Sequence, residues 1–283
     1  MTARLLEGRP VAEAIWRDLE PRVAAFLERV GRAPCLGLVG GADESAAAYG
    51  RQIERQFGRH GLAVTTQTAQ AADVLSAINQ LNRNDAIDGI LMLTPLPQGV
   101  DAERAVLAIE PTKDVDGQHP VNLGLLAQRR PVFAPATALG GLRLLQHYGV
   151  TLRGARAVVV GRSPVVGMPL TLLLIDADAT VSVCHSRTDD LAAVTRTADI
   201  LCVAMGRPHL IGPDYVQPHC VVLDFGTSPG PDGTVLGDVD TDAVSNLVSA
   251  ITPVPGGTGP TTVAVLAEQT VRAAEMHERR ARA

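Results

Sequence analysis

Lysine is almost missing from this chain of 283 residues, in which Lys113 is the sole lysine beside 24 arginines. Any mechanism that needs a lysine amine therefore has one residue available. Aromatic residues are also scarce, at 3% of the chain. The hydrophobic core must therefore be filled mainly by alanine, valine, leucine and isoleucine.

The chain has few cysteines, and their spacing is not that of a metal site. No C-x-x-C pair occurs among them; they are Cys35, Cys184, Cys202 and Cys220. This usage is typical of reduced thiols in a cytoplasmic protein, which is the location we expect. The histidines His119, His185 and His209 share no ligand spacing, so we expect no metal ion.

Long apolar segments and dense basic segments are absent too. Apolar runs such as Leu170–Ile175 are far too short to span a bilayer. Charged residues such as Arg4 and Glu7 near the start make a signal peptide unexpected. The formal net charge is −5, and no basic run alternates with aromatics. A membrane protein and a nucleic-acid-binding protein are therefore both disfavoured.

Strands and helices are expected to alternate along the first part of the chain. Apolar residues at helical spacing, from Val11 through Ile15 to Val23, predict a helix over residues 5–30. Short apolar runs predict buried strands at residues 35–40, 62–66 and 89–93. Helices are predicted over residues 45–60, 72–82 and 101–109. This alternation predicts an α/β fold with a parallel sheet covered on both faces.

A second series of the same kind follows. A helix is predicted over residues 139–148, and strands at residues 157–160, 180–184, 200–203 and 221–224. Residues 251–260 form a loop rich in proline and glycine, and a closing helix is predicted over residues 262–278. The length suits two modest domains or one large α/β domain.

A glycine turn follows the first strand of this second series. It runs from Gly161 to Gly167, reads Gly-Arg-Ser-Pro-Val-Val-Gly, and leads into an apolar helix. Strand, turn and helix in this order place backbone N–H groups and the positive end of a helix against a pyrophosphate. The spacing differs from G-x-G-x-x-G, so a plain connecting turn is the alternative. We expect a dinucleotide site here.

The end of the following strand favours NADP over NAD. Enzymes that prefer NAD usually carry Asp or Glu there, bonded to the ribose 2′-hydroxyl. This chain has His185, Ser186 and Arg187 instead, with no carboxylate until Asp189. Hydroxyl and cationic groups suit the 2′-phosphate of NADP. A solvated surface charge is the alternative for Arg187.

Several motifs together carry a family resemblance that spans nearly the whole chain. They are Asp88-Gly89-Ile90 with Pro95-Leu96-Pro97, Lys113-Asp114-Val115-Asp116-Gly117, Gly161-Arg162-Ser163-x-x-Val166-Gly167-x-Pro169, Cys184-His185-Ser186-x-Thr188 and Pro253-Val254-Pro255-Gly256-Gly257-x-Gly259-Pro260-x-Thr262. Each motif is weak alone, and their order along the chain makes the set specific. The chain resembles the methylenetetrahydrofolate dehydrogenase/cyclohydrolase family.

The resemblance implies two α/β domains. Residues 1–120 and 262–283 would form the folate-binding catalytic domain, and residues 121–261 a Rossmann domain that binds NADP. The implied activity is oxidation of 5,10-methylenetetrahydrofolate with NADP, followed by hydrolysis of the methenyl product to 10-formyltetrahydrofolate. A folate substrate and a homodimer are also implied.

The resemblance also assigns individual residues. Tyr49 and Asp116 are the expected catalytic residues, matching the tyrosine that lies against the folate and the aspartate that hydrogen-bonds the pterin. Further substrate contacts are expected from Pro255, Gly256 and Gly257. The expected cofactor contacts lie in loops that follow strands and are Gly161, Arg162, Ser163, Val166, His185, Ser186 and Thr227.

Two polar positions of the family pattern are apolar in this chain. The family has a lysine four residues after the tyrosine, on the same helix face, and here that position is Ile53. The family's glutamine before Pro-Leu-Pro, which hydrogen-bonds the lysine, is Leu93 here, within the expected substrate site. Arg51 and Arg55 point to other helix faces, and a guanidinium with a pKa above about 12 is a poor proton shuttle.

These losses affect the two activities unequally. Hydrolysis needs proton transfer and a positioned water, whereas hydride transfer needs mainly alignment and the exclusion of water. We therefore expect an NADP-dependent dehydrogenase with weak or lost cyclohydrolase activity. The alternatives are a bifunctional enzyme that uses another base such as Asp116, a folate- or NADP-binding pseudoenzyme, and a dehydrogenase of a different substrate.

Overall fold

The computed structural model describes residues 2–231 and 233–282, and the chain divides into two compact units. Unit 1 comprises Met1–Glu13 and Thr137–Thr262, and unit 2 comprises Ala14–Ala136 and Val263–Ala283. The two-domain α/β fold expected from the sequence is confirmed. The compact units divide after residues 13, 136 and 262, whereas the functional domains predicted from the sequence divide after residues 120 and 261. Those functional boundaries stay a prediction.

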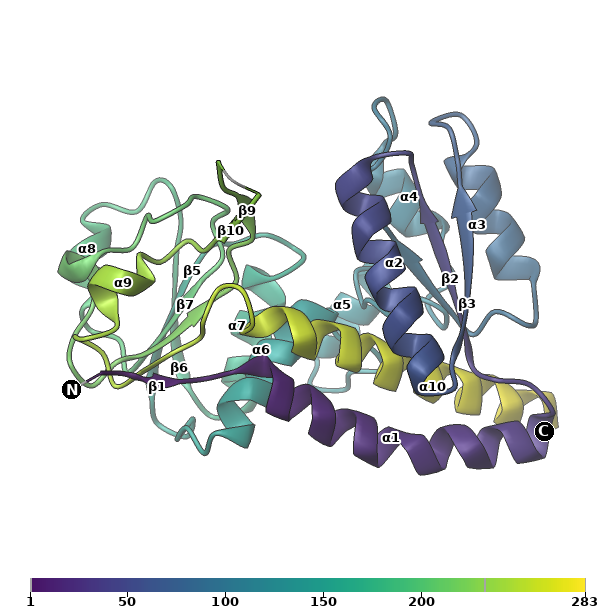
Figure 1. Cartoon of the computed structure of the whole chain (residues 1–283), viewed down its shortest axis with the longest axis horizontal. Coiled ribbons are helices and arrows are strands. Elements are labelled where there is room, and N and C mark those ends of the chain that lie inside the picture. The colour runs from purple at the N-terminus through teal and green to yellow at the C-terminus, as the bar shows by residue number, and fades with distance from the viewer. Residues whose placement is uncertain (1, 232, 283) are drawn as a thin grey trace. The chain divides into compact units, whose positions relative to one another are not determined.

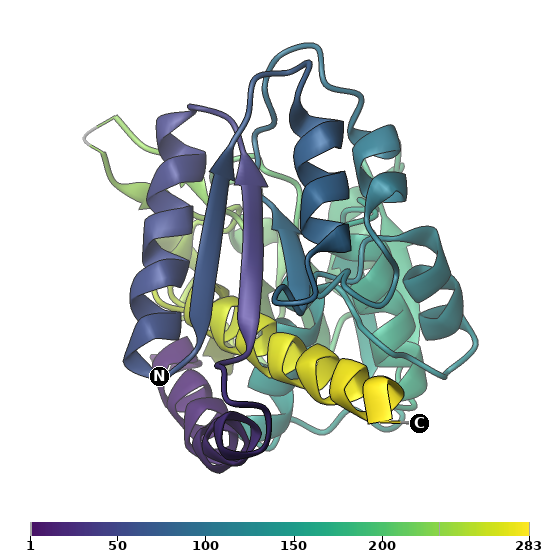
Figure 2. The same ribbon diagram turned by 90° about the vertical axis from the view of Figure 1, so that its right-hand side faces the viewer.

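In the described part of unit 2, a parallel sheet has the strand order β3-β2-β4. Its strands are β2 (Cys35–Gly40), β3 (Ala63–Thr68) and β4 (Gly89–Met92). The connection from β2 to β3 and the connection from β3 to β4 run in opposite directions across the sheet. Because both connections are right-handed, their two helices lie on opposite faces. Figures 1 and 2 show this arrangement for α2 (Glu44–Arg59) and α3 (Val74–Arg83).

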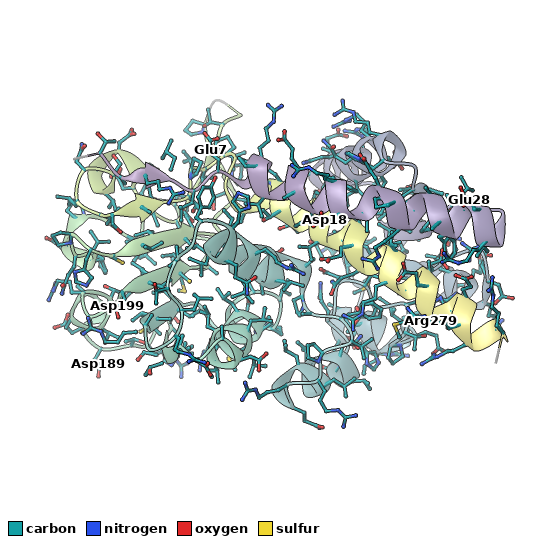
Figure 3. The ribbon with its side chains drawn as sticks, turned by 90° about the horizontal axis from the view of Figure 1, so that it is seen from below. Glu7, Asp18, Glu28, Asp189, Asp199 and Arg279 are labelled. Atoms are coloured by element: carbon teal, nitrogen blue, oxygen red, sulfur yellow. The ribbon has the colours of Figure 1, made fainter. Side chains whose placement is uncertain are left out.

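Further helices complete unit 2 around this sheet. They are α4 (Ala102–Ala108), α5 (Pro120–Ala127), most of α1 (Gly8–Val30) and most of α10 (Thr258–Arg282). Within unit 2, α1 and α10 lie side by side, as Figure 3 shows with Asp18 labelled on α1 and Arg279 on α10. Paired bonds of 3.0–3.1 Å join Arg22 to Glu275 and Arg29 to Glu278.

In the described part of unit 1, a larger parallel sheet has the order β1-β11-β8-β7-β5-β6. Its strands are β1 (Arg4–Leu5), β5 (Arg156–Val160), β6 (Thr180–Cys184), β7 (Ile200–Val203), β8 (Val221–Asp224) and β11 (Ala250–Ile251). The order reverses at β5, which has β6 on one side and β7 on the other. Open α/β sheets bind ligands at such a switch point, beyond the carboxyl ends of the strands.

Further elements of unit 1 surround this sheet. They are the helices α6 (Ala136–His147), α7 (Gly167–Asp176), α8 (Leu191–Thr195) and α9 (Thr241–Val244), and the 3₁₀ turn η1 (Pro213–Tyr215). The separate hairpin of β9 (Ser228–Pro229) and β10 (Val235–Leu236) projects away from the sheet (Figure 1). Figure 1 shows α7 on one side of the strands and α8 and α9 on the other. Across the described residues, no helix combines the length and apolarity needed to cross a membrane.

Both ends of the chain differ from the sequence-based prediction. The first helix was expected from residue 5, but it begins at Gly8 because Arg4 and Leu5 pair with Ala250 and Ile251. For the same reason the expected loop at residues 251–260 contains the end of β11, and α10 already starts at Thr258. A two-residue strand has no periodicity to detect, so the sequence offered no signal for this pairing.

One buried amide holds two backbone segments of unit 2 together. The side chain of Gln269 on α10 donates to the carbonyl oxygens of Val115 at 2.6 Å and Ala134 at 2.9 Å. Its own oxygen accepts the N–H of Ala134 at 2.9 Å. The loop that carries Asp116 is therefore tied to α10.

We predict that Gln269→Leu lowers the free energy of unfolding by about 3 kcal/mol, because it leaves buried backbone groups without partners. Urea unfolding followed by circular dichroism measures this change. Gln128→Leu is the matched control, since Gln128 is exposed in the same unit. Equal stability of the two variants would contradict the proposed tie.

Candidate functional site

The glycine turn of unit 1 closes tightly against the ends of β5 and β7. Gly161 follows β5 with a φ of +129°, and a Cβ there would lie 2.3 Å from the carbonyl oxygen of Ala204. Gly167 begins α7, and a Cβ there would lie 2.1 Å from the carbonyl oxygen of Gly161. Only glycine permits both the positive φ and this close approach of backbone to backbone.

Ser163 shapes the start of α7. Its hydroxyl oxygen accepts the N–H of Val166 at 3.1 Å and that of Gly167 at 3.5 Å. Arg162 and Ser163 are themselves exposed at the positive end of the helix. The capping role was not expected from the sequence, which suggested only a cofactor contact. A tight glycine turn, an exposed guanidinium and a helix N-terminus together fit a dinucleotide phosphate.

The loop after β6 presents the residues expected to favour NADP. Val160 of β5 is in register with Cys184 of β6, so the two loops leave neighbouring strands at the same level. The N–H of His185 donates to Thr188 Oγ1 at 2.9 Å, and the N–H of Arg187 donates to His185 Nδ1 at 3.2 Å. Because Nδ1 accepts, a neutral His185 carries its proton on Nε2. This turn leaves Ser186 and Arg187 exposed.

Two buried carboxylates organise the loops after β7 and β8. Asp224 accepts the N–H groups of Gly226, Asp238 and Val239 at 2.7–3.0 Å. Asp238 in turn accepts the N–H groups of the loop after β7, namely those of Met205, Gly206 and Arg207 at 2.5–2.9 Å. Burial raises the pKa of Asp224 to about 6. Thr227 follows this network and is exposed. Asp224 ends β8 and Asp238 lies in a loop, and in a sequence such aspartates resemble solvated charges, so this network went undetected.

The proline- and glycine-rich loop of unit 1 is held by the start of α1. The N–H of Gly8 donates to the carbonyl oxygen of Gly256 at 2.8 Å. A Cβ on Gly8 would lie 1.8 Å from the carbonyl oxygen of Gly257. Pro255 and Gly256 are exposed, while Gly257 is buried. This loop therefore presents its first two candidate residues and uses the third for packing.

In unit 2 the structure brings Tyr49 of α2 close to Asp116. Asp43 caps α2 by accepting the N–H groups of Ser45 and Ala46 at 2.9 and 3.0 Å, which sets where the helix begins. Burial raises the pKa of the Tyr49 phenol, and the charge of Asp116 raises it further. Both side chains keep some exposure to solvent. Tyr49 and Asp116, which the family resemblance assigns separately, therefore lie close together within one unit.

Asp116 has an unusual electrostatic environment. Burial raises its pKa to about 6, and the neighbouring charge of Asp114 acts in the same direction. Hydrogen bonds from the side-chain amide of Gln118 and from the N–H of Ala136, at 3.3 Å, partly oppose this shift. A carboxylate with a pKa near 6 can exchange protons near neutral pH.

The sole lysine is fully committed elsewhere. Lys113 is buried, and its Nζ donates to the carbonyl oxygens of Leu81, Asn82 and Asn84 at 2.8–3.2 Å. These are the last carbonyls of α3 and its cap, so the ammonium stabilises the negative end of that helix. All three of its donors are used, and Lys113 cannot take over the missing role at position 53.

The positions of the missing lysine and glutamine are apolar and buried. Ile53 is fully buried, and Leu93 is 4% exposed. A Cβ on Gly40 would lie 2.9 Å from Leu93 Cβ, and one on Gly50 would lie 3.0 Å from Leu93 Cδ1. Leu93 thus packs closely against these glycines under α2, at the wall of a small pocket that all three residues line. Arg51 pairs with Glu44 at 2.6 Å on the exposed side of the helix.

The fold and the turn after β5 define a two-unit α/β protein with an NAD(P)-type sheet. Residues 135–278 match the NAD(P)-binding domain, and residues 6–116 the catalytic domain, of tetrahydrofolate dehydrogenase/cyclohydrolase. The bifunctional protein FolD of Chloroflexus aggregans is 44% identical over 278 residues, with 96% of this chain and 98% of that protein covered. The chain therefore belongs to the tetrahydrofolate dehydrogenase/cyclohydrolase family, as its motifs indicated.

Solved structures agree with this assignment. The bifunctional FolD methylenetetrahydrofolate dehydrogenase/cyclohydrolase of Campylobacter jejuni has a TM-score of 0.92 at 36% identity, with 97% of this chain and 99% of that chain covered. The FolD structure of Trypanosoma brucei, complexed with NADP cofactor and inhibitor, has a TM-score of 0.92 at 34% identity over 100% of both chains.

We predict that Gly167→Ala weakens binding of NADP by about tenfold or more, equal to about 1.4 kcal/mol, because the new methyl group would push α7 away from Gly161. Isothermal titration calorimetry measures the affinity. Gly212→Ala is the control in the same unit, since no atom lies within 4 Å of a Cβ there. Unchanged affinity in Gly167→Ala would show that the turn does not depend on this contact.

Proposed function

We propose that this protein is an NADP-dependent 5,10-methylenetetrahydrofolate dehydrogenase whose cyclohydrolase activity is weak or lost. The contrast between a complete glycine turn in unit 1 and the buried, apolar pair Ile53 and Leu93 in unit 2 carries this proposal. The dehydrogenase half of the proposal is supported by the family, which is that of a dehydrogenase/cyclohydrolase, and by the bifunctional FolD relative.

NADP is the proposed cofactor. The backbone at Gly161, Arg162 and Ser163, with Val166 behind it, would hold the pyrophosphate at the start of α7. The loop of His185 and Ser186, together with Arg187, would hold the 2′-phosphate through a hydroxyl and a cation. Thr227 is a further proposed contact. The NADP in the Trypanosoma brucei structure supports this choice. When bound, NADP supplies the hydride acceptor.

We propose folate contacts for the residues that the family resemblance assigned. In unit 2, Tyr49 would lie against the ring system, Asp116 would accept hydrogen bonds from the pterin, and Leu93 would supply an apolar wall. In unit 1, Pro255, Gly256 and Gly257 are the proposed substrate loop. Oxidation of the methylene bridge requires no proton transfer by the protein, so these residues need only orient the substrate and exclude water.

Hydrolysis makes different demands, and the structure explains why we expect it to be weak. Water must add to the methenyl carbon and lose a proton, and the carbon–N5 bond must then break with protonation of nitrogen. An amine beside the bridge could carry these protons. Ile53 and Leu93 can neither accept the proton of the water nor donate one to the nitrogen. Loss of an acid/base group typically slows the step it serves by about 10²–10⁴.

A second candidate is a bifunctional enzyme in which Asp116 acts as the base. Its pKa of about 6 and its position beside Tyr49 favour this reading. A base works in its deprotonated form, so hydrolysis would rise with pH through about 6 and level off above it. The Asp116→Asn variant would then lose hydrolysis.

A homodimer through the edge of unit 1 is also proposed. β6 is an edge strand of the described sheet. The neighbouring helix α7 exposes apolar side chains along one face, with Met168 43% and Ile175 50% exposed. Val165, just before α7, is 37% exposed. An open strand edge beside an exposed apolar helix face is suited to a symmetric contact with a second copy.

The central experiment supplies methylenetetrahydrofolate with NADP, and with NAD in parallel. We expect NADPH to form together with accumulating methenyl absorbance, and a higher kcat/KM for NADP than for NAD. NADPH without methenyl accumulation would favour the bifunctional candidate. Absence of any NADPH would contradict both, and would leave a binding protein or an enzyme of another substrate.

We predict that Ile53→Lys together with Leu93→Gln raises methenyl hydrolysis by about tenfold or more, because the pair restores an amine with its amide partner. A stopped-flow assay of methenyl decay measures the rate. Ile53→Lys alone is the control, since it buries an ammonium without a partner and should be less stable. A double variant that folds and binds folate but hydrolyses no faster would refute the assigned cause.

We predict that Ile175→Lys with Met168→Glu shifts the protein from dimer to monomer, because charges would be buried in the contact. Light scattering after size-exclusion chromatography measures the mass. Leu107→Lys is the control, since Leu107 is 51% exposed on α4 of the other unit. A wild-type protein that is monomeric at micromolar concentration would rule out the homodimer.

A further inference from the structure

Gln118 is a polar side chain in the loop of Asp116 that the proposed reaction does not yet use. It lies directly after the motif that ends at Gly117, and it is half-buried. Its side-chain Nε2 donates to Asp116 Oδ2 in a short hydrogen bond. Its position is therefore defined by the same carboxylate that we assign to the pterin.

The backbone of Gln118 is itself held in place. Its N–H donates to Asp114 Oδ1 at 3.2 Å. Asp114 is buried and also accepts the N–H of His119 and the side-chain amide of Asn122, both at 2.8 Å. A chain of contacts thus runs from Asp114 to the backbone of Gln118, and from the side chain of Gln118 to Asp116.

The turn beside Gln118 has little freedom to move. Gly117 has a φ of +64°, and a Cβ there would lie 2.5 Å from the carbonyl carbon of Ala134. Gln269 fixes Val115 and Ala134 on either side of this contact. The only donors shown for the Asp116 carboxylate, among the described residues, are the amide of Gln118 on Oδ2 and the N–H of Ala136 on Oδ1.

We propose that Gln118 is a positioning residue for the folate: its amide locks the Asp116 carboxylate in one orientation and leaves its own carbonyl oxygen as a second acceptor for the pterin. This assignment rests on the proposed function. An amide that gives its NH₂ group to a carboxylate must turn its oxygen elsewhere. A pterin carries an amino group next to a ring N–H, so two neighbouring acceptors would match it and discriminate against rings that lack these donors.

The charge balance of the site gives Gln118 a second effect. Among the described residues, the titratable groups that face Asp116 are Asp114 in the same loop and Tyr49 on α2. The charge of Asp114 raises the pKa of Asp116, and the Tyr49 phenol supplies no positive charge. The amide of Gln118 is thus a principal group that favours the ionised carboxylate. Removing the amide should shift the protonation of Asp116 to higher pH, a change that a purely structural residue would not produce.

The test compares Gln118→Leu with wild type and with Gln128→Leu, whose glutamine is exposed in the same unit. Carbon-13 NMR of aspartate-labelled protein without ligand follows the Asp116 carboxyl, which is assigned from Asp116→Asn. We expect its titration midpoint to rise in Gln118→Leu and to stay in place in Gln128→Leu. The KM for methylenetetrahydrofolate should rise by about tenfold, the range for one hydrogen bond to a charged group, with the KM for NADP unchanged.

The acidic limb of the kcat/KM profile should move to higher pH together with the NMR midpoint. An unchanged midpoint would overturn the locking role, and a shifted midpoint with folate KM within twofold of wild type would overturn the substrate role. If wild type makes no NADPH, the proposed function fails, and calorimetric binding of tetrahydrofolate then replaces KM as the readout. Gln118→Met serves the same measurements if Gln118→Leu does not fold.

Discussion

The loop from Lys113 to His119 is held from several directions within unit 2, and the proposed chemistry depends on that restraint. Lys113 binds the end of α3, Asp114 binds the start of α5, and Gln269 of α10 binds the carbonyl of Val115. Between these anchors the loop presents Asp116 beside Tyr49, partly buried and with a raised pKa. A partly buried carboxylate is stabilised by fixed donors, and rigid surroundings supply them without reorganisation when a ligand arrives.

In both units, glycines allow neighbouring segments to pack closely. In unit 1, Gly161 and Gly167 let the turn close against β7 and α7. In unit 2, Gly40 and Gly50 leave room for the side chain of Leu93 beneath α2. The first closure creates a surface of exposed polar groups, while the second creates an apolar contact. This difference underlies our proposal that cofactor binding is retained and acid/base chemistry is reduced.

Much of this could be predicted from the sequence, and the rest required distant contacts. The strands at residues 35–40, 180–184, 200–203 and 221–224 have the predicted bounds, because each is a short apolar run with clear turn signals. The pairing of β1 with β11, and the short helices α8 and α9, have no periodicity to reveal them. In the site, motifs pointed to Gly161 and Asp116 but not to the cap at Ser163, the network of Asp224 and Asp238, or the contact of Gln118. Each of these depends on which loops meet in space.

The burial and hydrogen bonding of Lys113 also determine how the protein reacts with reagents that modify amines. Its ammonium is buried and saturated by carbonyl groups, so side-chain amines that acylating or reductively alkylating reagents could reach are absent from this chain. A lysine introduced at an exposed position would therefore be the one side-chain amine open to isotopic methylation. Its signal would have to be distinguished only from that of the N-terminal α-amine, which makes this chain a simple background for measuring the basicity of an introduced amine.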